Sequence, residues 1–319
     1  MNIDLLNLQP QTISKNLKGK FIMVYGLPKV GKTTLLSKFD KCLICSFEPG
    51  TNALNNVYVQ PVNSWADWKK MIKQLKMPQV QEKFATLGID TADLAWEACV
   101  KWICNENNVE KIGDIPYGQG YDMAKKEFRD TFKELAFMGY GLVFVSHSDE
   151  KVFKDEKGEE YTQICPALPK RPYDVINKMV DIIAYLRRIK INDVEKTYMF
   201  FRGNDRFLAG SRYKYMVDKI EFSYENLVQA IYDAIDKEIE NSGGSHQATN
   251  EENPYYLKSF DDLMIEAKEL WGEMVRNNRQ KEILSILKDV FGKETKFSDI
   301  TENEQDKLIV ALDKIKEIK

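Results

Sequence analysis

The sequence predicts an α/β protein with a mostly parallel central sheet flanked by helices, followed by a small helical bundle. Two observations lead to this fold class. Strand and helix signals alternate through residues 1–240, an order typical of parallel sheets covered by helices on both faces. In addition, the run Gly26-Leu27-Pro28-Lys29-Val30-Gly31-Lys32-Thr33 has the G-x-x-x-x-G-K-[ST] pattern of a phosphate-binding loop. It stands between an apolar strand and a helix, the context that this loop requires.

Apolar runs mark the strands of the predicted sheet, and amphipathic stretches mark its helices. Strands are expected at 21–25, 42–47, 57–59, a segment ending at Asp90, 142–146, 181–189 and 197–202. Helices are expected directly after the loop, from Ser64, after Asp90, after the glycine-rich segment 113–120, and at about 224–240. The helix from Ser64 carries a start signal, because Ser64 and Asp67 form a capping box.

A change in composition divides the chain after residue 240. Residues 241–254 are rich in Gly, Ser, Asn and Glu, a composition typical of a flexible polar linker. Residues 255–319 hold three amphipathic helices, with Gly292 ending the second and a Thr301/Glu304 capping box starting the third. We therefore expect an α/β core at 1–240, a linker at 241–254 and a three-helix domain at 255–319. Docking of a partner, contact with DNA and a structural role all remain open for this bundle.

Composition limits the class of protein. Of the 319 residues, 43% are hydrophobic and 30% are charged, as in globular proteins, and no run approaches the roughly 18 apolar residues of a membrane span. The net charge of −3 is not the strongly basic balance of a dedicated duplex-DNA binder. The five cysteines complete no zinc-binding pattern, so we expect reduced thiols and an intracellular location.

The loop predicts a nucleoside triphosphate site. Its glycines let backbone N–H groups turn inward around a phosphate, and the next helix directs its positive end at that phosphate. Lys32 is expected to reach the β- and γ-phosphates, and the Thr33 hydroxyl to ligate Mg²⁺. The expected cofactors are thus ATP and Mg²⁺. The predicted nucleotide-binding residues are Gly26, Pro28, Lys29, Val30, Gly31, Lys32, Thr33 and Thr34.

Two acidic residues follow strands of the predicted sheet. Asp90 ends one strand and is expected to hold the metal together with Thr33, although an Asp at this position also caps the next helix. Glu48 follows the second strand, which we expect beside the strand that precedes the loop. That neighbour would place the carboxylate near the γ-phosphate, where it can orient or deprotonate the attacking water. The alternative for Glu48 is an exposed residue in a Pro-Gly turn.

Further polar residues suit the remaining parts of a hydrolytic site. His147 follows the strand at 142–146 and is expected to sense the γ-phosphate, with a helix-capping or structural role as the alternative. Charge developing on the γ-phosphate also calls for a cation, often an arginine from a neighbouring subunit. Arg202, Arg206 and Arg212 cluster in one segment and are candidates for it.

This order of motifs resembles the RecA-type ATPase core. The loop comes first, then Glu48 after the second strand, Asp90 after the third and a polar residue after the fourth. The resemblance implies that Glu48 is the catalytic carboxylate. Residues 210–213 look like the K-N-R-F motif of the RadA branch, with Gly210 in place of the lysine. By that match Arg212 is the cation that acts on the nucleotide of a neighbouring subunit, which implies a homo-oligomer, either a ring or a filament.

Several segments further resemble the RecA-like class of phage single-strand annealing ATPases, the Sak group. They are Gly118-Gln119-Gly120-Tyr121, Glu127-Phe128-Arg129, Gly139-Tyr140-Gly141 and Val145-Ser146-His147-Ser148. The resemblance covers about residues 15–240. It implies a phage-type ATPase in the bacterial host cytoplasm that binds single-stranded DNA and promotes annealing or strand exchange. The alternative is an ATP-switched loader or assembly factor that acts on a protein partner in DNA replication.

Two segments occupy the positions at which RecA-type proteins bind DNA, about 105–122 and 148–172. The second interleaves aromatic residues with cations, a pattern suited to stacking on single-stranded bases. The candidate DNA-binding residues are Lys154, Lys170 and Arg171. Because the first half of this segment is net acidic, a solvated β-hairpin is an equally good interpretation.

Overall fold

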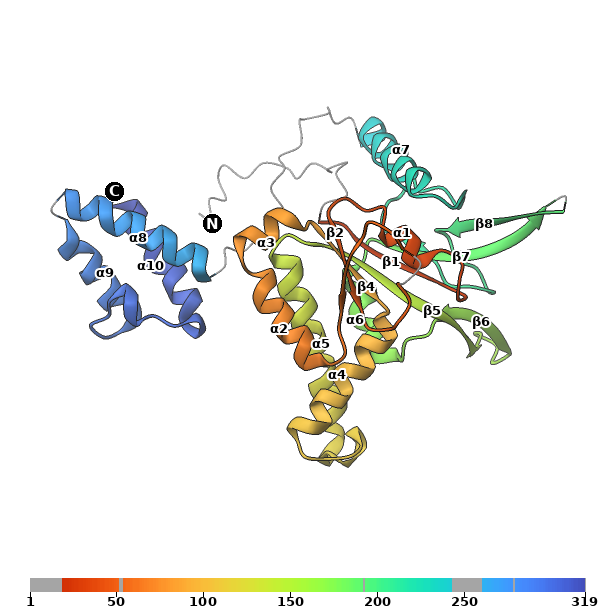
Figure 1. Ribbon diagram of the computed structural model, residues 1–319, viewed down its shortest axis with the longest axis horizontal. Helices are drawn as coiled ribbons and strands as arrows, with labels where there is room; N and C mark the ends of the chain where they lie inside the picture. The colour runs from red at the N-terminus through yellow and green to blue at the C-terminus, as the bar shows by residue number, and fades with distance from the viewer. Residues whose placement is uncertain (1–18, 52–53, 192, 243–259, 278, 319) are drawn as a thin grey trace. The chain divides into compact units, whose positions relative to one another are not determined.

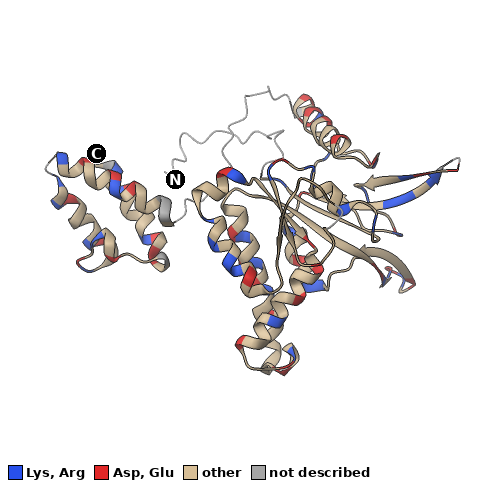
Figure 2. Ribbon diagram, in the orientation of Figure 1, with Lys and Arg blue, Asp and Glu red and all other residues tan. Residues whose placement is uncertain are grey.

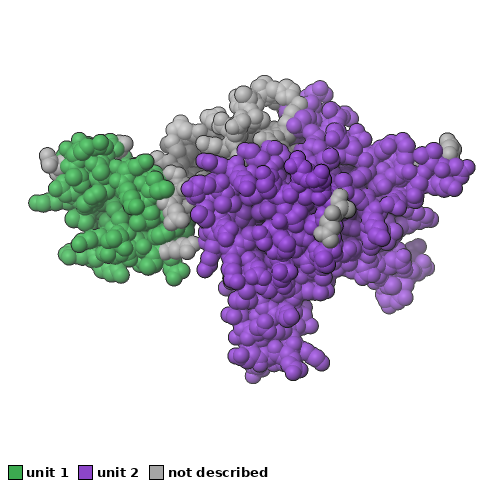
Figure 3. Space-filling view, in the orientation of Figure 1, with its two compact units in different colours: residues 1–11, 257–319 green, residues 12–256 purple. Residues whose placement is uncertain are grey.

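The computed structural model describes residues 19–51, 54–191, 193–242, 260–277 and 279–318. The described part of the chain forms two compact units, one within residues 12–256 and the other within residues 257–319 (Figure 3). We call the first the ATPase unit and the second the C-terminal unit. The predicted linker 241–254 lies outside the described residues apart from 241 and 242, so its boundaries stay a prediction.

A mostly parallel sheet forms the centre of the ATPase unit (Figure 1). Its main path runs β3-β2-β4-β5-β1-β7-β8-β10, with β6 paired to β5 and β9 paired to β7. The strands are β1 (Phe21–Gly26), β2 (Cys42–Ser46), β3 (Tyr58–Pro61), β4 (Thr86–Asp90), β5 (Gly141–Lys154), β6 (Glu160–Pro166), β7 (Ile182–Ile191), β8 (Val194–Phe200), β9 (Gly210–Ser211) and β10 (Lys219–Glu221). Pairing is parallel among the first six strands of this path, which are β3, β2, β4, β5, β1 and β7. Pairing is antiparallel where β6, β8, β9 and β10 join the sheet. The predicted α/β fold class is confirmed.

Helices cover both faces of the sheet. They are α1 (Lys32–Leu36), α2 (Trp65–Leu75), α3 (Pro78–Lys83), α4 (Ala92–Glu106), α5 (Gln119–Phe137), α6 (Lys170–Met179) and α7 (Tyr224–Ser242). Side chains alternate along each strand, so Met23 and Tyr25 of β1 pack with α2, α4, α5 and α6. Ile22 and Val24 face the other way and pack with α1 and α7. Strands buried on both faces read as continuous apolar runs, which is why the sequence identified them.

Some elements differ from those predicted. The predicted helix at 224–240 is α7, and the Ser64/Asp67 start signal holds, since the Asp67 N–H donates to Ser64 Oγ at 3.1 Å. The polar segment 148–172 was left open between a DNA-binding loop and a hairpin. It forms the antiparallel β5–β6 hairpin followed by the start of α6. Helix α6 was not predicted because prolines stand at its start, although proline is tolerated in a first helical turn.

The C-terminal unit is a bundle of three helices, α8 (Phe260–Arg276), α9 (Gln280–Phe291) and α10 (Gln305–Glu317). Gly292 ends α9 in the left-handed conformation at φ 72°, where glycine carries no side-chain penalty. Thr301 and Glu304 are hydrogen bonded to each other just before α10. The predicted apolar faces form its core: Leu263, Ala267, Leu270, Met274, Ile283, Leu287, Phe291, Leu308, Leu312 and Ile315 are all buried.

Two further observations bear on the composition. Within the described residues, no helix combines the length and the apolar character needed to cross a bilayer. The five cysteines are buried and free of disulfides. Burial raises the pKa of Cys42 to about 12, so this thiol is a packing residue rather than a nucleophile.

An aromatic cluster between α2, α5 and the sheet is expected to supply much of the stability of the ATPase unit. The Phe132 ring is fully buried and lies 4.8 Å from Phe128, 5.0 Å from Phe144 and 5.8 Å from Trp68 between ring centroids. Replacing Phe132 by alanine is expected to lower the free energy of unfolding by about 3–5 kcal/mol, because the lost contacts leave a cavity. Urea unfolding measures this loss. Phe137→Ala, on the same helix but half-buried, is the control, and an equal loss in both variants would contradict the assignment of the cluster.

Candidate functional site

The polar residues predicted for the site lie at one edge of the parallel part of the sheet, although β5 continues past His147 to Lys154. In the strand register Gly26 of β1 lies beside His147 of β5, and Ser46 of β2 lies beside Asp90 of β4. Asp90 in turn pairs with Val145 of β5. Because the strands are parallel, their carboxyl ends share an edge, which is where open α/β sheets bind ligands. The sheet therefore brings Lys32, Thr33, Glu48, Asp90 and His147 to the same side of the ATPase unit.

The phosphate-binding loop turns sharply between β1 and α1. Gly31 precedes α1 at φ 103°, a conformation that residues with a side chain rarely adopt. Gly26 packs so closely against β7 that an added Cβ would stand 2.6 Å from the Leu186 carbonyl oxygen. Both glycines of the motif are thus required by the backbone. Of the other predicted nucleotide-binding residues, Pro28, Lys29 and Thr34 are exposed and Val30 is buried.

Lys32 is buried beneath the loop. Its Nζ donates to the carbonyl oxygens of Gly26 and Leu27, each at 2.8 Å. Burial lowers the pKa of Lys32, whereas the negative charges of Asp90, Glu48 and Asp93 act to raise it. An anion beside this ammonium would offset the free energy of burying it, so the lysine is suited to a phosphate group.

Thr33 and Asp90 meet across the sheet edge and suit a hydrated magnesium ion. Thr33 Oγ1 donates to Asp90 Oδ2 at 2.8 Å, while the buried Asp90 Oδ1 has no partner among the described residues. Burial raises the pKa of Asp90, and the hydrogen bond from Thr33 opposes that rise. A cation would stabilise this carboxylate. Mg²⁺ is typically held by one or two protein groups together with phosphates and water, a role for which these two side chains are suited.

Glu48 lies at this edge, but the strand that precedes it has different neighbours from those predicted. We expected β2 to lie beside β1, and this is wrong, because β5 and β4 lie between them. The prediction assumed that strands adjacent in the sequence are also adjacent in the sheet. The connection from β1 to β2 instead crosses over β5 and β4. The turn after β2 is held by Ser46, whose Oγ donates to the Glu48 carbonyl oxygen at 2.6 Å. Glu48 Oε2 lies 3.8 Å from His147 Nε2.

His147 contacts a carboxylate that the sequence analysis did not identify. Its Nδ1 lies 3.0 Å from Oδ2 of Asp93, in the first turn of α4. The signal that would have identified Asp93 is its spacing of three residues from Asp90, which places it in the first turn of the helix that follows this strand. His147 thus stands between two acidic side chains, Asp93 on one ring nitrogen and Glu48 on the other.

A second contact that was not predicted involves the hairpin of β7 and β8. Arg188 on β7 donates from Nη2 to the Lys29 carbonyl oxygen of the phosphate-binding loop at 2.6 Å. Lys29 itself has a positive φ of 62°. The arginine therefore fixes the exposed part of the loop from the neighbouring strand. No local sequence pattern marks it, because the contact depends on the pairing of β1 with β7.

Arg212 is not gathered with these residues. It directly follows β9, which pairs with the beginning of β7, at the sheet edge opposite the loop. Its guanidinium donates to the Lys178 carbonyl oxygen at 2.5 Å and to Asp181 Oδ1 at 3.2 Å. Arg212 therefore lies away from the phosphate-binding loop of its own subunit. Arg202 and Arg206, its neighbours in the sequence cluster, are exposed.

The two predicted DNA-binding segments meet in the structure. Arg171, in the first turn of α6, lies 4.6 Å above the ring of Tyr121 at the start of α5, and its Nε is 3.8 Å from Asp122. Lys170 is the exposed neighbour of Arg171. Lys154 stands apart from them at the end of β5, where it pairs with Glu160 at 3.5 Å.

A cavity of about 790 Å³ opens beside this contact, between α4, the segment that follows it and Pro169. Trp96, Tyr121, Lys101 and Lys111 are among the residues that line it. Tyr117, on the same segment, is 97% exposed. Figure 2 shows cationic and acidic residues interspersed along the helices of the ATPase unit, so cations do not form one continuous stripe in that view.

Comparisons with known proteins identify a family and several similar proteins. The profile of a family described as an AAA domain matches residues 18–213. The SPbeta prophage-derived uncharacterized protein YorG of Bacillus subtilis (strain 168) is 28% identical over 328 residues, covering 100% of this chain and 99% of that protein. Among solved structures, a KaiC-like protein of Pyrococcus horikoshii OT3 has 12% identity and a TM-score of 0.36 over 57% of this chain and 78% of that one. The flagellar accessory protein FlaH of Methanocaldococcus jannaschii has 11% identity and a TM-score of 0.33 over 57% and 77%.

Proposed function

The chain belongs to the AAA domain family of P-loop ATPases, and from this premise we propose that it is a Mg²⁺-dependent ATP hydrolase of phage type. In this proposal the protein forms a homo-oligomer in the host cytoplasm. The oligomer binds single-stranded DNA and promotes annealing or strand exchange. The observation that carries the hydrolase is the meeting of Lys32, Thr33, Asp90, Glu48 and His147 at one sheet edge. A relative whose name describes it as prophage-derived supports the phage context.

Hydrolysis follows from the chemistry of these side chains. When ATP binds, Lys32 exchanges its two carbonyl partners for oxygens of the β- and γ-phosphates. Bound Mg²⁺ supplies positive charge that neutralises the phosphates, and Thr33 and Asp90 are the residues that would hold it. Glu48 accepts a proton from the attacking water, whose oxygen bonds to the γ-phosphorus as the bond to the β-phosphate oxygen breaks, giving ADP and phosphate. Exposed at the opposite edge, Arg212 is proposed to serve the nucleotide of a neighbouring subunit.

The DNA-binding part of the proposal is supported by the contact between the two candidate segments. Arg171 stacks on Tyr121, and the lining of the cavity beside them includes the aromatic residues Trp96 and Tyr121 and two lysines, together with Glu97 and Glu110. Single-stranded bases are bound by such a combination, in which aromatic rings stack and cations neutralise the backbone. We place Lys170 and Arg171 in this DNA contact. Lys154 is a weaker candidate because it stands apart from this contact, at the end of β5.

The DNA proposal predicts that single-stranded DNA both binds to the protein and increases its rate of ATP hydrolysis. Lys170→Ala and Arg171→Ala are each expected to lower the slope of log affinity against log salt by about 0.7, the value for one phosphate contact on a single strand. Fluorescence anisotropy over a salt series measures binding, and a coupled assay measures hydrolysis. Lys178→Ala, exposed at the other end of α6, is the matched control. Absence of binding and of stimulation at low salt would contradict the proposal.

A second candidate function is an ATP-switched loader or assembly factor that acts on a protein partner. The net charge of −3 and the separate three-helix unit favour it. The same titration separates the two candidates. A loader would hydrolyse ATP without a response to DNA alone, whereas an annealing ATPase would respond.

A further inference from the structure

We propose that Asp93 is a positioning residue for ATP hydrolysis: it orients His147 so that His147 Nε2 and Glu48 together hold the attacking water. The inference rests on the proposed hydrolase and adds to it a role for a carboxylate that the sequence motifs leave unassigned. Three observations support it: the contact of Asp93 with His147, the distance from His147 to Glu48, and the burial of Asp93.

The first contact fixes the protonation pattern of the ring. His147 Nδ1 lies 3.0 Å from Asp93 Oδ2, which is hydrogen-bond distance. A carboxylate only accepts hydrogen bonds, so the proton of this bond resides on Nδ1. In the neutral ring the other nitrogen, Nε2, then carries a lone pair and accepts. Asp93 thus selects one of the two tautomers and directs the accepting nitrogen toward Glu48.

The second distance leaves room for one water. His147 Nε2 and Glu48 Oε2 are 3.8 Å apart, too far for a direct hydrogen bond. A water about 2.8 Å from each atom, the usual hydrogen-bond length, can donate one hydrogen to Nε2 and the other to the carboxylate. Its oxygen lone pairs are then free to face the γ-phosphate. Two acceptors orient a water more narrowly than Glu48 alone would, and orientation lowers the activation free energy.

The third observation separates this role from ordinary helix stabilisation. The Asp93 side chain is only 15% exposed, and its Oδ1 is buried without a partner among the described residues. It lies in the first turn of α4, yet α4 has no side-chain cap hydrogen bond. Asp67 in the first turn of α2 provides the comparison, because it does take part in a cap with Ser64. Both charges suit a helix start, but only Asp93 faces the site.

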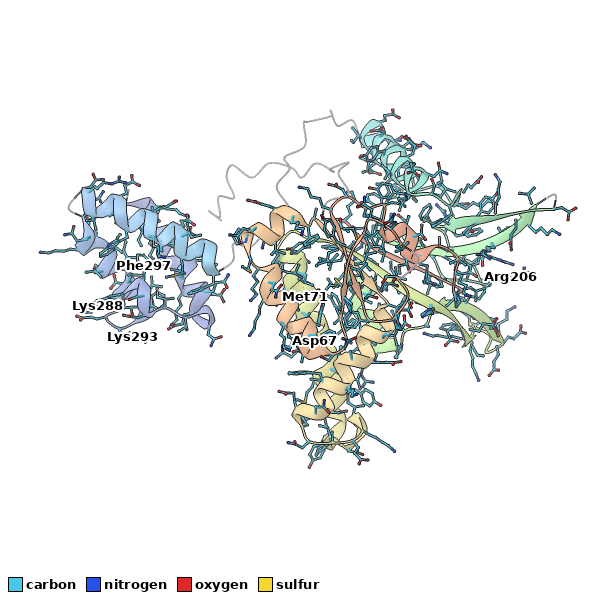
Figure 4. The ribbon with its side chains drawn as sticks, in the orientation of Figure 1. Asp67, Met71, Arg206, Lys288, Lys293 and Phe297 are labelled. Carbon is cyan, nitrogen blue, oxygen red and sulfur yellow. The ribbon has the colours of Figure 1, made fainter. Side chains whose placement is uncertain are left out.

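Kinetics of matched variants test the proposal. Asp93→Asn and Asp93→Ala are expected to lower kcat about 10- to 100-fold, as for other residues that orient a catalytic ring, while KM changes less than about twofold. Asp67→Asn, at the position labelled in Figure 4, should retain the kcat of the unmodified protein. In a His147→Ala background, Asp93→Ala should add no further loss, since the two residues act as one unit. An independent, multiplicative loss in the double variant would overturn the inference.

A spectroscopic measurement tests the tautomer without any hydrolysis. The chain has two histidines, so ¹⁵N-histidine NMR at pH about 8.5, where an ordinary imidazole is neutral, shows two rings. His246→Gln identifies the signals of His147. Protonation at Nδ1 that is lost in Asp93→Ala supports the proposal, and protonation at Nε2 in the unmodified protein overturns it. If the unmodified protein hydrolyses no ATP, the proposed function fails, whereas the tautomer still reports on Asp93.

Discussion

Lys32→Ala is expected to weaken ATP binding about 10²- to 10³-fold and to bring hydrolysis below detection. The ammonium is buried and donates to two loop carbonyls, so its removal leaves no lysine charge beneath the loop. Truncating one partner of a buried charge pair typically costs about 2–5 kcal/mol, because the phosphates would remain desolvated without a cation. Equilibrium binding of a fluorescent ATP analogue measures the affinity, and phosphate release measures hydrolysis.

Lys38→Ala is the control for Lys32, because this lysine is exposed shortly after α1 and carries the same charge. It should bind and hydrolyse ATP normally. Thermal unfolding without nucleotide establishes that both variants are folded. Normal ATP binding by Lys32→Ala would mean that the triphosphate is held elsewhere, and the proposed site would have to be abandoned.

Glu48→Gln should separate binding from chemistry. The amide keeps the size of the side chain and can still contact a water, but it no longer accepts a proton. We expect kcat to fall about 10²- to 10⁴-fold, the range for loss of a general base, with ATP affinity within about threefold of the unmodified protein. Single-turnover hydrolysis with a separate binding titration distinguishes these quantities.

The control for Glu48→Gln is Glu82→Gln, which makes the same chemical change at an exposed position in α3. It should leave turnover unchanged. Unchanged turnover in Glu48→Gln itself would remove Glu48 from the proposed mechanism. His147 would then lose its nearest proposed catalytic partner, so this variant also bears on the arrangement of Asp93.

The sequence predicted those parts of the molecule that depend on local pattern. The motif at residues 26–33 predicted the position of the loop because its glycines are needed by the local backbone: Gly31 has a positive φ, and Gly26 has no room for a Cβ. Asp90 and His147 were predicted as site residues because Asp90 ends one apolar run and His147 follows another. The order of strands across the sheet is not a local property, and the expectation that β2 adjoins β1 was therefore wrong.

Contacts that depend on pairing between distant segments could not be predicted in the same way. Asp93 reaches His147 only because β4 lies beside β5, and Arg188 reaches Lys29 only because β7 lies beside β1. Arg212 was proposed from a short motif, which carries no information about the edge of the sheet that it occupies. The contacts of a single polar residue therefore depend on which strands the topology places side by side.

Helix α4 connects the proposed hydrolytic residues with the cavity near Tyr121. It is 15 residues long, about 22 Å at 1.5 Å per residue. It begins at Ala92, with Asp93 in its first turn beside the proposed hydrolytic residues, and ends at the cavity near Tyr121. A helix that joins the two proposed sites in this way offers a route for coupling them, because a tilt at one end displaces the other. If ATP binding strengthens the proposed DNA contact, thermodynamic linkage makes that coupling reciprocal: DNA then strengthens ATP binding by the same factor.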